Sequence, residues 1–140
     1  MENKVETAKI ETVENFLKEV PTFYLATISD NRPKCRPIGF HMLQNGKIYF
    51  GVGTFKDVYK QLEKNPYAEI CACKGGRFLR YYGKAVFEDN ETMAEAVFER
   101  SPGLKNFYNE ATGHKLGIFH LEEATAEFHV MSKLESSYSL

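Results

Sequence analysis

Three stretches of the chain carry apolar residues at every third or fourth position, the spacing of an amphipathic helix. These stretches are residues 7–19, 54–64 and 90–100. Each has a boundary signal, since Pro21 ends the first, Asn65–Pro66 stops the second and Asn90 caps the third. We also expect a short helix over residues 104–112.

The second helix is expected to begin at Thr54. Thr54 and Asp57 have the spacing of a capping box, with Asp in place of the usual Glu. The apolar side of this helix is predicted to be Phe55, Val58, Tyr59 and Leu62.

Between the helices, the chain is rich in β-branched and aromatic residues, which favour strands. The predicted strands are residues 22–29, 34–43, 47–52, 67–73, 77–88 and 117–131, the last of which is a strand or a strand pair followed by a polar tail over 132–140. Asn45–Gly46 is a strong hairpin signal, and Asp30–Pro33 and Gly75–Gly76 are further turns. Short antiparallel strands with inserted helices predict one domain over residues 1–140, of the α+β class and mainly β, built as a small barrel.

Composition excludes several classes of protein. With 43% hydrophobic and 26% charged residues, the chain has the make-up of a globular domain. Its formal charge of -1 gives no general attraction to nucleic acid or to an anionic membrane. No apolar run approaches the ~20 residues that span a bilayer, and the first residues do not resemble a signal peptide.

Three cysteines, Cys35, Cys71 and Cys73, lack both Cys-x-x-Cys spacing and a Cys/His quartet. This argues against a zinc site and against a dithiol redox motif. Reduced thiols in a cytoplasmic protein are the simplest interpretation.

The segment Gly51–Asp57 contains the most informative local signal. A strand ends there, two glycines allow close approach of the backbone, and a helix begins. Helix amino termini bind anions through unpaired N–H groups, and Lys56 adds a full charge that the helix dipole disfavours. An anion site is one interpretation; a capped surface helix with a solvated lysine is the other.

Arg36 precedes Pro37 in a strand that must be irregular or at an edge there, because proline has no N–H to donate. Arginine suits bidentate contact with phosphate, although a solvated arginine on an edge strand explains the sequence equally well. Between Arg36 and Lys56, the edge of residues 47–51 is expected to offer main-chain groups to a flat ring.

Taken together, these motifs resemble a known family. Pro33-x-x-Arg36-Pro37, the Asn45–Gly46 hairpin, Tyr49–Phe50 and Gly53-Thr54-x-Lys56 resemble the FMN-binding split barrel of the pyridoxamine 5′-phosphate oxidase superfamily. The resemblance extends from about Phe23 to Phe128 and is nearest to the nitroimidazole-resistance (Nim) type proteins. It implies an antiparallel, Greek-key-like barrel with flanking helices, and a homodimer with the flavin at its interface.

The resemblance also implies a cofactor site. Arg36, Thr54 and Lys56 would hold the FMN phosphate, and Ile38, Tyr49, Phe50 and Gly51 would border the isoalloxazine. Pro37 is a further cofactor-binding residue by the same resemblance. The sequence departs from the family in two places. Thr54-Phe55-Lys56 stands where many members have Ser-Arg-Lys, so one phosphate ligand is missing. The carboxy-terminal Arg-x-His motif of the true oxidase is not matched after Gly117, which argues against pyridoxamine phosphate as the substrate.

The histidines give a weaker signal. His41 lies five residues after Arg36 on the predicted strand, where the true oxidase has a basic cofactor contact, so it is a candidate for contact with the flavin or a substrate. An ordinary strand histidine is the alternative. His120 and His129 are too far apart in one strand region to form a local metal clip.

Two functions of different class follow from these features. The first is an FMN-dependent oxidoreductase that passes electrons from NAD(P)H to a small acceptor, for example a nitroaromatic compound, with the flavin carrying the hydride chemistry. The second is a flavin- or haem-binding carrier or sensor with the same fold and no turnover. Nucleic-acid binding, a third class, would call for a basic stripe that this neutral chain lacks.

Overall fold

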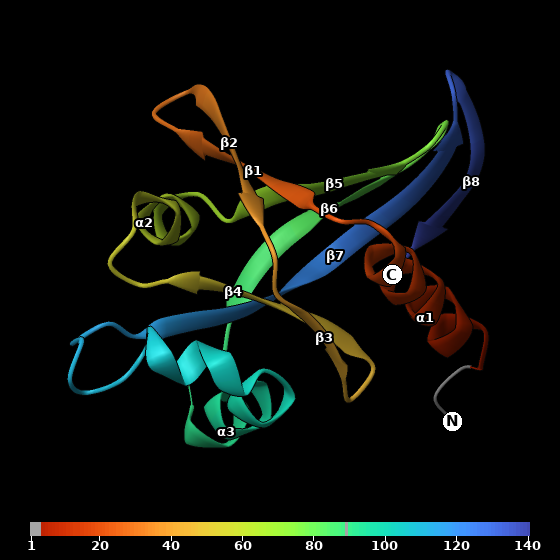
Figure 1. Ribbon diagram of the computed structural model, residues 1–140. Helices are drawn as coiled ribbons and strands as arrows, with labels where there is room; N and C mark the ends of the chain where they lie inside the picture. The colour runs from red at the N-terminus through yellow and green to blue at the C-terminus, as the bar shows by residue number, and fades with distance from the viewer. Residues whose placement is uncertain (1–3, 89) are drawn as a thin grey trace.

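The computed structural model of the protein describes residues 4–88 and 90–140, with side chains from Lys9 onward. This part of the chain forms three α-helices, one 3-10 helix and eight strands (Figure 1). In chain order these are α1 (Lys4–Glu19), β1 (Phe23–Ser29), β2 (Arg32–Ile38), β3 (His41–Gln44), β4 (Lys47–Gly53), α2 (Asp57–Lys64), β5 (Tyr67–Lys74), β6 (Arg77–Phe87), α3 (Glu91–Arg100), η1 (Pro102–Asn106), β7 (Leu116–Val130) and β8 (Lys133–Ser139).

The strands form one antiparallel sheet in the order β2-β1-β5-β6-β7-β4-β3, with β8 paired to β7. Tight turns join β1 to β2, β3 to β4, β5 to β6 and β7 to β8. Both residues of the Asn45–Gly46 turn have positive φ, 52° and 76°, as the hairpin signal predicted. The end strands β2 and β3 do not pair with each other, so the sheet curves without closing. The mainly β, α+β fold with flanking helices is therefore confirmed.

The single strand predicted over residues 34–43 is wrong. It is two strands at opposite ends of the sheet, since β2 pairs with β1 and β3 pairs with β4. The chain crosses between them through Gly39 and Phe40 (Figure 1). A pattern of apolar and polar residues does not specify which neighbour a strand pairs with. The sequence pattern therefore did not show that residues 32–38 and residues 41–44 pair with different strands.

The predicted polar tail over residues 132–140 is also wrong, because residues 133–139 form β8. Met131, with φ at 57°, makes the turn that folds β8 back on β7. Most of β8 is exposed, and Tyr138 is its side chain that packs against the main core. A strand with so little burial has almost no apolar alternation for a prediction to use. The helix predicted over 104–112 is replaced by η1 and the turns after it.

Helix α2 begins at Asp57, three residues later than predicted, and Lys56 is its N-cap without a side-chain cap. Thr54 makes no capping box, because its hydroxyl donates to the carbonyl of Lys115, 3.2 Å away. Phe55 lies before the helix and is 45% exposed, whereas Val58 and Leu62 are buried as expected. By contrast, Asn90 caps α3 as predicted, accepting from the backbone N–H of Met93 at 2.8 Å.

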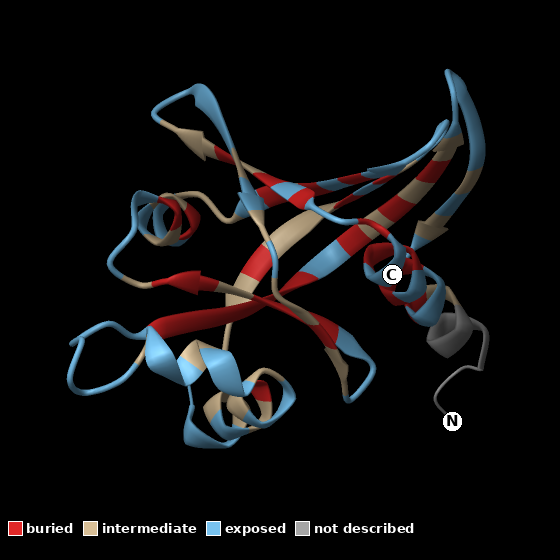
Figure 2. Cartoon of the chain, in the orientation of Figure 1, coloured by how far each residue is buried: buried red, intermediate tan, exposed pale blue. Residues whose placement is uncertain are grey.

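Two apolar clusters hold the fold together. The main core lies between one side of α1 and the concave sheet and includes Val13, Leu25 and Phe50. Figure 2 shows buried positions along the inner side of α1 and the central strands. A separate cluster centred on Val97 and Ile118 lies beneath α3 and η1. A cavity extends from one cluster to the other.

Candidate cofactor site

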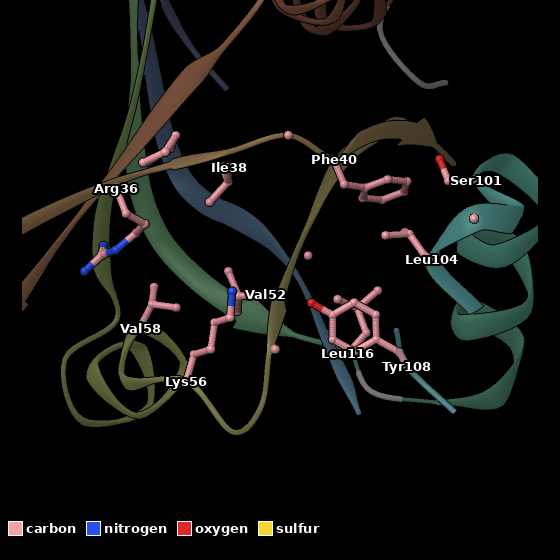
Figure 3. Close-up of a pocket in the computed structure, with 15 residues that line it drawn as sticks. Arg36, Ile38, Phe40, Val52, Lys56, Val58, Ser101, Leu104, Tyr108 and Leu116 are labelled. Atoms are coloured by element: carbon pink, nitrogen blue, oxygen red, sulfur yellow. The ribbon is translucent and has the colours of Figure 1, made fainter. Parts of the chain in front are cut away.

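A cavity of about 550 Å³ lies where β2, β4, the start of α2 and the η1 segment approach one another (Figure 3). This volume is in the range of small-molecule and cofactor sites. The residues that line it are Arg36, Pro37, Ile38, Gly39, Phe40, Gly51, Val52, Gly53, Lys56, Val58, Ser101, Gly103, Leu104, Tyr108 and Leu116.

Arg36 forms one end of the cavity. β2 is an edge strand, as Pro37 predicted, and it carries the guanidinium across β1 toward α2. Nη1 donates to the carbonyl of Leu25 at 3.0 Å and to the hydroxyl of Thr27 at 2.8 Å. Nη2 donates to Oε1 of Gln61 at 3.0 Å. These contacts fix the side chain, but all three acceptors are neutral.

The electrostatics of the cavity are one-sided. Arg36 and Lys56 are the charged residues among those that line it, and no described acidic residue joins them. Burial lowers the pKa of Arg36 from its usual value, yet an arginine stays protonated at any physiological pH. The cavity therefore has a positive end suited to an anion.

Main-chain groups of β4 form a second wall. β3 pairs with β4 only as far as Phe50, so the edge of residues 51–53 opposite β7 has no strand partner in the described chain. The free edge predicted over 47–51 is therefore shifted toward the carboxyl end of the strand. A Cβ on Gly51 would lie 3.1 Å from Leu116, so this glycine gives the Leu116 side chain its place in the wall.

The end remote from Arg36 is largely apolar. Phe40, Leu104 and Leu116 lie there together with the hydroxyl-bearing Tyr108 and Ser101 (Figure 3). Burial raises the pKa of Tyr108, so its phenol stays neutral and offers a hydroxyl rather than a charge. One end of the cavity thus suits an anion and the other an uncharged planar group.

The structure brings together five of the predicted site residues. Arg36, Pro37, Ile38, Gly51 and Lys56 all line the cavity.

Three predicted site residues are not on the cavity wall. Phe50 is fully buried in the main core, and the phenol of Tyr49 is buried, its pKa raised first by desolvation and then by a hydrogen bond to Glu88. Thr54 contacts Lys115 instead. Assignment of these residues to the cofactor remains a prediction.

His41 is not on the Arg36 strand, because it begins β3 after the crossing. Its Nδ1 lies 2.6 Å from Oε1 of Glu14, a buried carboxylate on α1. His41 is absent from the wall of the cavity, and its contact with Glu14 attaches α1 to β3.

Sequence reasoning missed the residues at the apolar end and those that hold Arg36. Ser101, Leu104 and Tyr108 come from the segment after α3, about 50 residues beyond β4, and show no local motif. Thr27 and Gln61 carry no signal either, since their role depends on β1 and α2 lying side by side.

Within the described residues no group of three or more His, Cys, Asp or Glu side chains is arranged to bind a metal ion. In the same part of the chain, every helix is too short or too polar to span a bilayer.

Comparison with known proteins agrees with this architecture. Residues 10–129 match the pyridoxamine 5′-phosphate oxidase family model, so the chain belongs to that family. The crystal structure of a NimC/NimA family protein from Clostridium acetobutylicum superposes with a TM-score of 0.84 and 29% identity, and the match covers 94% of each chain. The predicted antiparallel split barrel is thereby confirmed. No curated protein gave a significant match.

More distant structures share the fold alone. The general stress protein 26 from Bacillus anthracis has a TM-score of 0.71 at 13% identity over 93% of this chain and 97% of that one. A pyridoxamine 5′-phosphate oxidase-related, FMN-binding protein from Nostoc punctiforme has a TM-score of 0.66 at 14% identity, covering 95% of each chain.

Proposed function

We propose that the protein is an FMN-dependent oxidoreductase that uses NAD(P)H to reduce a small acceptor, for example a nitroaromatic compound. The acceptor class follows the resemblance to nitroimidazole-resistance proteins. The missing Arg-x-His motif argues against pyridoxamine phosphate as the substrate. The exposed free thiols of Cys35, Cys71 and Cys73 support a cytoplasmic location.

One observation carries the proposal: the two cations at one end of the cavity face no acidic residue along its described wall. FMN has a matching shape, with a phosphate dianion at one end and a planar ring at the other. The wall residues fit both the phosphate and the ring. Arginine and lysine, here Arg36 and Lys56, are residue types that bind phosphate, and the rest of the cavity wall is mostly apolar.

Three groups of wall residues have different tasks in this proposal. Arg36 and Lys56 bind the phosphate and set the position of the cofactor. Ile38 and the free edge of Gly51 lie beside the ring, where the backbone offers hydrogen-bonding groups. The neutral hydroxyl of Tyr108 and the apolar side chain of Leu104 border the space left for the acceptor. Bound FMN supplies the hydride chemistry, and the protein supplies binding and orientation.

We further propose that the protein is a homodimer with the cofactor near the interface. Phe55, 45% exposed beside the cavity, is an apolar group that a second copy would cover. Sedimentation at micromolar concentration tests this, and a monomer that binds FMN fully would contradict it.

The decisive experiment is an absorption spectrum of the protein as purified and after addition of FMN or riboflavin, followed by anaerobic addition of NADH or NADPH. We expect FMN to bind more tightly than riboflavin and the bound flavin to be bleached by the nicotinamide. Bound flavin that is never bleached would favour the carrier or sensor function. A protein that takes up neither flavin would overturn the proposal, and a Soret band would indicate haem.

A further inference from the structure

The contacts of Arg36 are unusual for a partly buried cation, because the described chain supplies no negative charge to it. Its acceptors among the described residues are a carbonyl, a hydroxyl and a carboxamide. A guanidinium has five N–H donors, and these three bonds leave two of them, one on Nε and one on Nη2, without an acceptor in that part of the protein. Two neighbouring donors are what arginine uses to bind an oxyanion in bidentate fashion.

Gln61 completes this arrangement from α2. Its Oε1 accepts from Arg36 at 3.0 Å and from the hydroxyl of Thr27 at 2.6 Å. Thr27 is 2% exposed, and its hydroxyl accepts from Arg36 while donating to Gln61. The three side chains therefore form a closed set of hydrogen bonds in which one group only, the guanidinium, is charged.

The chemical identity of residue 61 matters for this reason. A glutamate has almost the same shape and would also accept both hydrogen bonds, but it would neutralise Arg36 at the same distance. An incoming phosphate would then meet a carboxylate beside its binding partner. The amide holds the guanidinium in the same place and leaves its full charge for the ligand.

We propose that Gln61 is a positioning residue for oxyanion binding: together with Thr27 it fixes the Arg36 guanidinium beside the cavity while leaving its charge unpaired. The inference rests on the proposed function, because the oxyanion in question is the FMN phosphate. It adds a specificity determinant that does not line the cavity and that no motif marks.

The test compares Gln61→Glu with Lys60→Gln, which makes the same change in net charge at the exposed neighbouring position. Dissociation constants for FMN and for riboflavin, which lacks the phosphate, are measured by fluorescence quenching. We expect Q61E to weaken FMN binding at least tenfold and to change riboflavin binding less than twofold, with K60Q close to the wild type for both. Gln61→Met, which removes the acceptor without adding a charge, should give a smaller loss for FMN alone.

Two results would overturn the inference while leaving the proposed function intact. One is an equal loss of FMN and riboflavin affinity in Q61E, which would make Gln61 a purely structural residue. The other is an unchanged FMN affinity. The thermal midpoint of unliganded Q61E should match or exceed that of the wild type, because the introduced carboxylate would pair with Arg36; a large decrease would also indicate a structural role.

A wild type that binds neither flavin would overturn the proposed function, and inorganic phosphate then tests Gln61 by itself. We expect phosphate to raise the thermal midpoint of the wild type and of K60Q but not of Q61E. A wild type that does not respond to phosphate would overturn the oxyanion site as well.

Discussion

Two arginines on the sheet, Arg36 on β2 and Arg80 on β6, are treated in opposite ways. Arg80 donates from Nε and Nη2 to both oxygens of Glu69, at 2.6 and 3.0 Å, and this pairing raises its pKa. Arg36 is held by neutral acceptors, and burial lowers its pKa. Arg80 thus forms a neutralised ion pair with Glu69 on an exposed sheet face. The charge of Arg36, by contrast, is unpaired and lies beside a cavity.

The difference gives a physical reason for the role proposed for Arg36. Taking a charge partly out of water costs free energy unless a partner compensates for it. In the folded protein Arg80 has such a partner in Glu69, whereas Arg36 contacts neutral hydrogen-bond acceptors. An oxyanion ligand would be the partner that Arg36 lacks, so the cost falls when the ligand binds.

The strongest way to break this comparison is to remove each arginine in turn. Arg36→Ala should lower FMN affinity by about 1–3 kcal/mol, the range for a charge-assisted hydrogen bond, and leave riboflavin affinity nearly unchanged. Arg80→Ala is the matched control and should change FMN affinity less than twofold. Titration of flavin fluorescence measures both. Equal losses in the two variants would mean that the charge of the protein matters and the position of Arg36 does not.

Lys56→Ala sharpens the comparison at the other cation of the cavity. Lys56 is exposed at the N-cap of α2, so solvent screens its contact and the loss of FMN affinity should be smaller, about 0.5–1 kcal/mol. The wild-type preference for FMN over riboflavin should also decrease with added salt. A preference that is independent of salt would argue against phosphate binding by these two cations.

Glu69→Gln tests the other arginine of the comparison, because it removes the carboxylate that pairs with Arg80. The pair is partly exposed, so the free energy of unfolding measured in urea should fall by less than about 1 kcal/mol. FMN affinity should stay the same, because Arg80 does not line the cavity that contains Arg36 and Lys56. A second flavin or phosphate site in this variant would show that loss of the carboxylate is sufficient to create one.

The smallest effect concerns acid stability near Arg80. A hydrogen bond from Tyr82, and then one from His129, lower the pKa of Glu127. A lowered folded pKa stabilises the protein above the unfolded value of about 4.5, and that contribution is lost as pH falls through the folded value. Tyr82→Phe should therefore unfold at a lower temperature than the wild type near pH 7, and the two should converge near pH 3. Melting curves across this range provide the check.

Much of the fold was predictable because it depends on local signals. The Asn45–Gly46 turn, the Asn90 cap and the proline ending α1 each act through a few neighbouring residues. The errors arose where distant segments decide the outcome. The crossing after Ile38 depends on which strands β2 and β3 pair with. β8 forms by pairing with the second half of the long strand β7.

The candidate site shows the same division. Arg36 and Lys56 could be found from the sequence because each lies next to a local signal. Arg36 directly precedes a proline, and Lys56 follows the glycines at which a strand ends. Tyr108 and Gln61 could not, because nothing near them in the sequence records that they approach β2 or β4. His41 was misplaced for the same reason, since its partner Glu14 is 27 residues away on α1.

The two ends of the cavity belong to separately packed parts of the molecule. The Arg36 end lies between β2 and α2, whereas Leu104 of η1 at the far end packs with α3 in a second apolar cluster, to which β-strand residues such as Ile118 also belong. Substitutions within residues 101–108 are therefore expected to disturb the Arg36 end less than substitutions in β2 or α2. Libraries confined to this segment would vary one end of the candidate cofactor site while leaving the two cations in place.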